Sequence, residues 1–223
     1  MYRRLKLAIL DYDMTLLDTL IDFYDALNRT LQLFGLDPIS YDRFIYLFKN
    51  DRLGFEIVPR HIDPKEFWKT FRKIYESRYA KPMEGVEYLL NILKLYGAKN
   101  IIVTGREVPS LKIWNELRRF NLHHYIDKVY TMFDLILLGG IERELFDKSW
   151  LLINVLKEFG VEPEEAIMLG DYWIDALSSR NAGIPFIGIT RYEERARDLY
   201  INGAIMVVKD LYEAARAISE IVK

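Results

Sequence analysis

Acidic side chains occur in pairs at two places where an apolar segment of the chain ends. The first is LAILDYDMTLLD at residues 7–18, in which Asp11 and Asp13 follow four apolar residues. Residues two apart project to the same side of an extended chain, so both carboxylates would face one site. The second is LGDYWID, which contains Asp171 and, one helical turn later, Asp175. Carboxylates gathered in this way hold divalent cations or carry out nucleophilic and acid–base steps.

Two further motifs add a hydroxyl group, a backbone amide and a positive charge. In VTGRE, Thr104 offers a hydroxyl and Gly105 an unencumbered backbone N–H shortly before a helix, which resembles a cradle for an oxyanion or a phosphate. In FDKS, Lys148 opens a helix and supplies a single positive charge. Each motif alone also fits an ordinary structural role, because Thr-Gly is a common turn and lysines are mostly solvated.

The acidic pairs have structural alternatives as well. An aspartate after a strand is often a turn or N-cap residue, and acidic residues at a helix start interact favourably with the helix dipole. All four motifs, however, are linked to strand ends, and ligands of open parallel sheets bind outside the carboxyl ends of the strands. The conjunction of the four therefore favours one functional site over four unrelated turns.

The elements that must position these residues alternate along most of the chain. Six short apolar runs predict parallel strands that are covered on both faces, at residues 5–10, 100–104, 128–132, 166–170, 184–189 and 204–208. Helical patterns separate them, for example at 86–97 and 149–160, where each pattern stops at a glycine. This alternation predicts an α/β fold with a doubly wound, mostly parallel, Rossmann-like sheet.

Residues 16–82 depart from the alternation because they contain helical patterns and no clear strand. One helix is expected over 16–35, with an apolar face that ends at Gly35. Another is expected over 63–80, with Asp63 as N-cap and Pro64 at the first helical position. We therefore expect a core domain of residues 1–15 and 83–223 with a helical cap domain of residues 16–82 inserted into it.

Composition narrows the class of ligand. The 223 residues carry 31 Lys plus Arg and 33 Asp plus Glu, and the net charge of −2 gives no argument for nucleic acid or an acidic membrane as partner. The chain has no cysteine, so any metal must be bound by oxygen or histidine. The apolar stretch at the N-terminus is too short for a signal peptide, and no apolar run reaches the length of a membrane span. We expect a soluble, cytoplasmic protein that acts on a small molecule.

The four motifs resemble those of the haloacid dehalogenase (HAD) superfamily of phosphotransferases: DYDMT at 11–15, VTG at 103–105, Lys148, and GDYWID at 170–175. Two departures leave every reacting group in place. Met14 stands where the superfamily often has glycine, and Ser149 follows the lysine where proline is common. The position of the helical insert matches the superfamily's cap after the first strand.

The resemblance implies a Mg²⁺-dependent phosphatase for a small phosphorylated metabolite, similar to phosphoglycolate phosphatase. In the superfamily's mechanism Asp11 attacks phosphorus to form an aspartyl-phosphate, while Asp13 acts as general acid and base. The metal ion would be held by Asp11, Asp171 and the backbone carbonyl of Asp13, with Asp175 as a further anchor.

The remaining motif residues would bind the phosphoryl group. The resemblance implies that Thr104 and the N–H of Gly105 contact phosphoryl oxygens, and that Lys148 offsets the negative charge. Asp13 argues against a dehalogenase, because halide needs no proton on leaving. Substrate selectivity is expected in the cap segment 50–62, where Arg52 and Arg60 are the candidate residues, although both could instead be solvated.

Three alternatives remain open at the level of sequence. A phosphomutase of the same superfamily would share the motifs. A response-regulator receiver also gathers aspartates, a threonine and a lysine at strand ends, but it has no cap. A catalytically silent interaction module would have no reason to keep Asp11, Asp13, Lys148 and Asp171 together.

Overall fold

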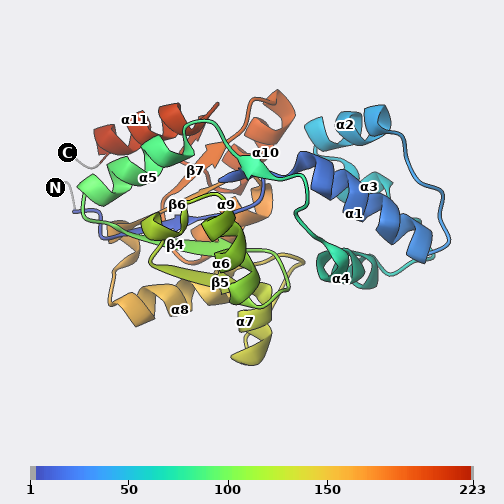
Figure 1. Ribbon diagram of the computed structural model, residues 1–223, viewed down its shortest axis with the longest axis horizontal. Coiled ribbons are helices and arrows are strands. Elements are labelled where there is room, and N and C mark those ends of the chain that lie inside the picture. Colours follow the sequence, from blue (N-terminus) through green and yellow to red (C-terminus); the bar gives the residue numbers. More distant parts are fainter. Residues whose placement is uncertain (1–3, 222–223) are drawn as a thin grey trace.

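The computed structural model describes residues 4–221, which form a parallel sheet with helices on both faces and four further helices at one end (Figure 1). The strands are β1 (Leu7–Leu10), β2 (Leu17–Asp18), β3 (Lys81–Pro82), β4 (Lys99–Thr104), β5 (Lys128–Thr131), β6 (Ala166–Gly170), β7 (Phe186–Ile189) and β8 (Met206–Val208). The helices are α1 (Leu20–Leu33), α2 (Tyr41–Lys49), α3 (Leu53–Glu56), α4 (Pro64–Ile74), α5 (Val86–Leu95), α6 (Ser110–Arg119), α7 (Met132–Leu137), α8 (Ser149–Phe159), α9 (Trp173–Asn181), α10 (Glu193–Asn202) and α11 (Leu211–Ile221). Two short 3₁₀ helices span His123–Tyr125 and Pro163–Glu165.

The main sheet has the strand order β5-β4-β1-β6-β7-β8, and every neighbouring pair in it is parallel. All six strands expected from the apolar runs are present. β1 lies in the middle of the sheet, where its four residues are fully buried. Leu7 and Ile9 pack into the apolar cluster on one face, and Ala8 and Leu10 into the cluster on the other. The continuous apolar pattern of the strand is thus explained by burial on both faces.

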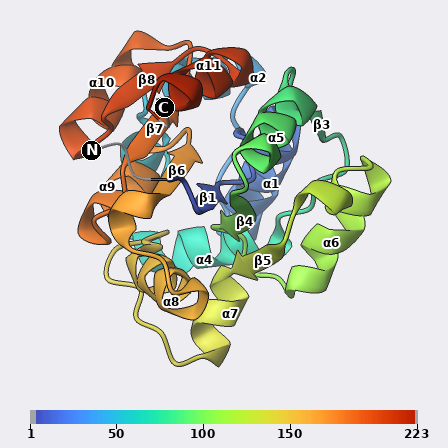
Figure 2. The same ribbon diagram turned by 90° about the vertical axis from the view of Figure 1, so that its left-hand side faces the viewer.

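Helices cover both faces of the sheet, as a doubly wound fold requires (Figures 1 and 2). On one face α5, α6 and α11 contribute residues such as Leu89, Ile113 and Ala214 to the core. On the other face α8, α9 and α10 contribute Leu152 and Leu199, among others. The α/β, Rossmann-like fold predicted from the sequence is confirmed. Within residues 4–221, no helix is both long and apolar enough to cross a membrane.

Helices α1 to α4 lie together beyond the carboxyl ends of the strands, on the opposite side of the molecule from both termini (Figure 1). They enclose an apolar cluster of their own, which includes Leu27, Phe44, Phe67 and Phe71. A separate apolar core is what an independent module needs. This cluster supports a cap at residues 16–82, and the division of the chain into a core and a cap stays a prediction.

Two expected helices have different ends in the structure. The helix expected over 63–80 ends at Ile74, because the backbone N–H groups of Arg78 and Tyr79 donate to the buried carboxylate of Asp22 instead of continuing the helix. The helix expected from residue 16 begins at Leu20.

A short strand, β2, lies in the segment between residue 16, where the helix was expected to begin, and Leu20, where α1 does begin. β2 pairs with β3 in an antiparallel ladder, Leu17 opposite Pro82 and Asp18 opposite Lys81. The two segments that connect α1–α4 to the rest of the molecule therefore run side by side. The expectation that residues 16–82 contain no strand is wrong at this boundary.

Candidate active site

Asp11 and Asp13 lie in the tight turn that follows the central strand. The N–H of Asp11 still donates to Leu169 of β6 at 2.9 Å, so this residue remains fixed to the sheet. Met14 then adopts a left-handed conformation with φ of 60°, and the chain reverses so that the N–H of Met14 donates to Leu17 at 2.7 Å. Left-handed backbone explains why glycine is favoured at this position and shows that methionine can fill it at some conformational cost.

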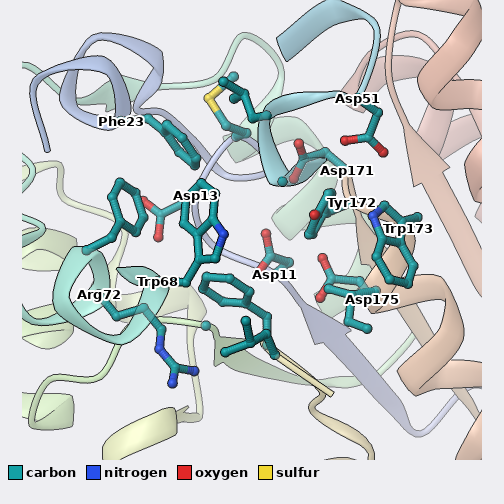
Figure 3. A pocket seen from close by; sticks show the side chains of 18 of the residues that line it. Asp11, Asp13, Phe23, Asp51, Trp68, Arg72, Asp171, Tyr172, Trp173 and Asp175 are labelled. Carbon is teal, nitrogen blue, oxygen red and sulfur yellow. The ribbon is translucent and has the colours of Figure 1, made fainter. Parts of the chain in front are cut away.

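Three carboxylates from two strand ends converge on one point (Figure 3). Asp11, Asp171 and Asp175 are buried, and each places an oxygen within 4.8 Å of the others. Thr15 ties two of them together, since its hydroxyl lies 3.1 Å from Asp11 Oδ2 and 3.5 Å from Asp171 Oδ1. Three of the four sequence-predicted aspartates are thus brought together by the sheet, whereas the carboxylate of Asp13 is bound by Arg106 instead.

Burial and mutual repulsion make this carboxylate cluster electrostatically costly. Burial, together with the negative charges of Asp175 and Asp171, raises the pKa of Asp11 to about 8 against the opposing effect of Lys148. Burial also raises the pKa of Asp171 to about 7. A cation bound by all three carboxylates would reduce their mutual repulsion and stabilise their ionised forms.

Lys148 lies in the middle of the acidic cluster. Its Nζ is 2.5 Å from Asp11 Oδ1 and 2.7 Å from Asp175 Oδ1, and its side chain is 3% exposed. Burial lowers the pKa of Lys148, but the carboxylates of Asp11 and Asp175 outweigh that effect and hold it above its ordinary value. The lysine is therefore a buried cation of the site, and the alternative of a solvated surface side chain is excluded.

The residues around Lys148 explain the serine that follows it. Asp147 accepts hydrogen bonds from the backbone N–H of Ser149 at 2.9 Å, from the hydroxyl of Ser149, and from the hydroxyl of Ser178 at 3.1 Å. The N–H of Lys148 in turn donates to Ser178 Oγ at 2.9 Å. The hydroxyl of Ser149 thus helps fix the start of α8, which holds the lysine in place.

Thr104 and Gly105 end the neighbouring strand β4. Thr104 is fully buried, and its hydroxyl oxygen accepts a hydrogen bond from the N–H of Arg106 at 3.2 Å. Gly105 lines the cavity, and a side chain there would meet Phe146 at 3.3 Å and approach Lys148 at 4.0 Å. Gly105 therefore leaves its backbone accessible beside the lysine, whereas Thr104 is not among the described residues that line the cavity.

The donor set of the acidic cluster suits a hard divalent cation. All its ligand atoms are carboxylate oxygens, which Mg²⁺ prefers. Asp175 Oδ1 is buried without a hydrogen-bond donor among the described residues, because the approach of Lys148 is an ion pair without hydrogen-bond geometry. A buried carboxylate oxygen with spare capacity fits a metal ligand or an atom that contacts a metal-bound water.

Two arginines that the sequence analysis did not select contact the acidic residues. Arg106 binds both carboxylate oxygens of Asp13, and Arg195 of α10 donates to Asp171 Oδ2 at 2.8 Å. Arg195 also lies 3.7 Å from Asp51 and 3.4 Å from the carbonyl of Phe48, both of which belong to residues 16–82. Arg106 follows directly after the VTG motif, so its position was a usable signal, whereas nothing in the sequence near Arg195 points to the site.

A cavity of about 370 Å³ opens between this cluster and helices α1–α4. The described residues that line it include Asp51, Leu53 and Phe55 of the segment expected to select substrate, but neither Arg52 nor Arg60. Arg52 is paired with Glu56 at 3.1 Å and its side chain is 56% exposed, and Arg60 is exposed as well. Selection of substrate by these two arginines stays a prediction.

Comparison with known proteins agrees with the motifs. The model of the haloacid dehalogenase-like hydrolase family matches residues 8–189. The phosphoglycolate phosphatase of Aquifex aeolicus is 31% identical over 184 residues, which cover 80% of this chain and 82% of that protein.

Solved structures have the same fold. A haloacid dehalogenase-like family hydrolase from Streptococcus pneumoniae matches 96% of this chain and 99% of its own with a TM-score of 0.73 at 18% identity. A candidate β-phosphoglucomutase from Thermotoga maritima matches 96% of this chain and 99% of its own with a TM-score of 0.65 at 22% identity. The chain therefore belongs to the haloacid dehalogenase-like hydrolase family, of which it is a phosphatase-like member.

Proposed function

We propose that this hydrolase is a Mg²⁺-dependent phosphatase that cleaves a small phosphorylated metabolite through an aspartyl-phosphate on Asp11. The observation that carries the proposal is the convergence of Asp11, Lys148, Asp171 and Asp175 at the carboxyl ends of β1 and β6, under a cavity of about 370 Å³. The phosphoglycolate phosphatase of Aquifex aeolicus supports a small phosphorylated substrate. A cytoplasmic location stays a prediction.

In the first step, Asp11 attacks phosphorus and the bond from phosphorus to the leaving oxygen breaks. Asp13 gives a proton to that oxygen, so the product leaves as an alcohol. In the second step, Asp13 takes a proton from water, and the water oxygen displaces the carboxylate of Asp11 from phosphorus to release inorganic phosphate. Each step leaves Asp13 in the protonation state that the other needs.

The remaining residues bind and orient the phosphoryl group. Lys148 supplies a positive charge within 2.5 Å of the attacking carboxylate, which reduces its repulsion of the phosphate. Gly105 offers a backbone N–H, and the hydroxyl of Thr104 orients the turn through Arg106. Asp11, Asp171, the carbonyl of Asp13 and Asp175 would hold Mg²⁺, which supplies charge neutralisation to the transferring phosphoryl group.

The test is phosphate release by the purified protein from a panel of sugar, glycolate, nucleotide and amino-acid phosphates, with Mg²⁺ and in excess chelator. The proposal predicts release only with Mg²⁺, and loss of all but a few per cent of the rate in Asp11→Asn. Asp25→Asn changes an aspartate of α1 that is 46% exposed, outside the cavity, and should keep the full rate. Transfer of phosphate between two positions of a sugar without release would identify a phosphomutase instead.

A further inference from the structure

The cavity above the acidic cluster has an aromatic wall contributed by the α1–α4 region. Six rings of this region line it: Phe23, Phe48, Phe55, Trp68, Phe71 and Tyr75. All of them except the exposed Phe55 are packed against one another, with centroids 4.8 Å apart for Phe23 and Phe71 and 5.4 Å apart for Trp68 and Phe71. Figure 3 shows Trp68 and Phe23 among the side chains near Asp11 and Asp13. The side of the cavity that faces the leaving group is thus a preformed apolar surface.

The positive charges that line the cavity are already matched by carboxylates of the protein. Four cationic side chains line it, and each lies within 4.0 Å of two carboxylates: Lys148 of Asp11 and Asp175, Arg106 of Asp13 and Glu116, Arg195 of Asp171 and Asp51, and Arg72 of Glu142 and Glu107. Among the described residues of the lining, no cationic side chain without a carboxylate partner remains to pair with a second anionic group of a substrate.

Arg72 lies on α4, the helix that also carries Trp68 and Phe71 of the aromatic wall, and most of its N–H groups are already engaged by carboxylates. Its Nη1 and Nη2 bind Glu142 at 2.6 and 3.2 Å, and Nη2 also lies 3.4 Å from Glu107. The Nε atom is buried without a hydrogen-bond partner among the described residues. The N–H of Nε therefore suits a neutral acceptor on a substrate. A substrate carboxylate would have to compete with Glu142 and Glu107 for the positive charge of this guanidinium.

The charge balance of the lining points the same way. Six carboxylates and four cations line the cavity, a formal excess of two negative charges. A divalent cation at the acidic cluster would bring the lining to formal neutrality, so a second anionic group on the substrate would add to the negative charge of the phosphate without any excess positive charge to offset it. A substrate such as phosphoglycolate would therefore place its carboxylate against aromatic rings and without a counter-ion, which is costly.

From the aromatic wall and the paired cations, we infer that the preferred substrate is a phosphate monoester whose leaving group is apolar, in particular aromatic, and carries no second negative charge. This inference rests on the proposed phosphatase function. It separates this chain from its phosphoglycolate phosphatase relatives in substrate class, while the phosphoryl chemistry stays the same. The cavity volume of about 370 Å³ is within the range of pockets that enclose a ring-containing ligand.

The test compares kcat/KM for three phosphates of primary alcohols with Mg²⁺: 2-phenylethyl phosphate, ethyl phosphate and 2-phosphoglycolate. Because the leaving group of each substrate is a primary alcohol, differences in kcat/KM report recognition of the leaving group more than intrinsic reactivity. We expect 2-phenylethyl phosphate to exceed both others at least tenfold, on the order of the selectivity that an apolar pocket provides. Equal or preferential use of 2-phosphoglycolate would overturn the inference and leave the phosphatase function standing. Hydrolysis of no monoester at all would overturn both.

Variants of the wall locate the selectivity. Phe55→Ala changes a ring that is 81% exposed, so folding should be kept even if Trp68→Ala is unstable. Both should lower the ratio of kcat/KM for 2-phenylethyl phosphate over ethyl phosphate at least threefold. Tyr46→Ala removes an exposed ring of α2 outside the cavity and should leave the ratio unchanged. A wild-type ratio in both Phe55→Ala and Trp68→Ala would refute the role of the wall.

A gain-of-charge variant tests the absence of a free cation. Phe55→Lys adds a positive charge at the edge of the cavity without touching the acidic cluster. The inference predicts that kcat/KM for 2-phosphoglycolate rises at least threefold relative to 2-phenylethyl phosphate, whereas the isosteric neutral variant Phe55→Met should not raise it. Equal ratios in the lysine and methionine variants would contradict the charge argument.

Discussion

The guanidinium of Arg106 holds both carboxylate oxygens of Asp13, with Nη2 2.5 Å from Oδ1 and Nε 2.8 Å from Oδ2. The guanidinium also contacts two rings, with Cζ 5.1 Å from the centroid of Tyr12 and 4.9 Å from that of Tyr75. The hydroxyl of Tyr75, which follows α4, also donates to Asp13 Oδ1 at 3.3 Å. The proposed acid/base residue is thus oriented by groups from both the core and the α1–α4 region.

Arg106→Lys should lower kcat by about 10- to 100-fold with little change in KM, because a lysine can contact only one oxygen of Asp13 and lets the carboxylate rotate. Arg118→Lys makes the same exchange on an exposed arginine of α6 and should keep wild-type constants. Steady-state kinetics and a thermal melt of both variants separate misorientation from unfolding. A wild-type kcat in a folded Arg106→Lys protein would show that the arginine is structural only.

Asp13→Asn should lower the rate for an alkyl phosphate by roughly 10²–10⁴, the usual worth of a positioned acid or base. With 4-nitrophenyl phosphate the first step needs no proton, so the intermediate should form and then persist. Stopped-flow absorbance should record a burst of about one nitrophenolate per enzyme, followed by slow turnover. Absence of a burst together with near-normal steady-state turnover would remove Asp13 from both proton transfers.

Chelation should abolish activity, and Mg²⁺ should restore it, because the cluster of Asp11, Asp171 and Asp175 offers only oxygen ligands. Ca²⁺ should bind and inhibit, since its larger and looser coordination would misplace the attacking carboxylate. The measurement is phosphate release against added metal after dialysis with chelator. Asp175→Asn should raise the Mg²⁺ concentration needed for half-maximal activity. Full activity in chelator, or better rescue by Zn²⁺ than by Mg²⁺, would contradict this ligand set.

The metal-free protein should lose stability as the pH rises. The pKa of Asp11 is raised from 3.8 to about 8 by burial, and that of Asp171 from 3.8 to about 7, so the folded state binds more protons than the unfolded state between these limits. Stability from these protons is complete below about pH 4 and is lost as the pH rises through 7 and 8. In chelator, Tm should be lower at pH 8.5 than at pH 5, and Mg²⁺ or Asp171→Asn should reduce the difference. A Tm that is as high at pH 8.5 would contradict the predicted cost of the ionised cluster.

Much of the fold was predictable because its signals are local. Each strand of the main sheet is an uninterrupted apolar run, and burial on both faces makes that pattern necessary, as at Leu7–Leu10. The end of α4 was not predictable, because the backbone N–H groups of Arg78 and Tyr79 donate to Asp22, which is far away in sequence, instead of continuing the helix.

The aspartates of the motifs were predictable because they lie shortly after apolar strands in the sequence. The arginine and tyrosine side chains that contact them were not predictable. Arg106 and Tyr75 reach Asp13 across 93 and 62 residues of sequence, and Arg195 reaches Asp171 across 24. An arginine or tyrosine alone carries no local sign of such a contact. The pairing of every cation that lines the cavity is likewise a property of tertiary structure, and it is the basis of the substrate inference.

The most direct test of the account is to trap the phosphoryl group on the protein. The enzyme is mixed with a monoester radiolabelled in its phosphate and Mg²⁺ for less than one turnover, and the reaction is quenched in acid. Radioactivity on the protein is counted in one portion. The other portion is reduced with borohydride, which releases the phosphate and converts a phosphorylated aspartate into homoserine. The account predicts label on the intact protein and homoserine at position 11, with neither in Asp11→Asn. Normal turnover without labelled protein, or homoserine at another aspartate, would contradict the role of Asp11 as the nucleophile.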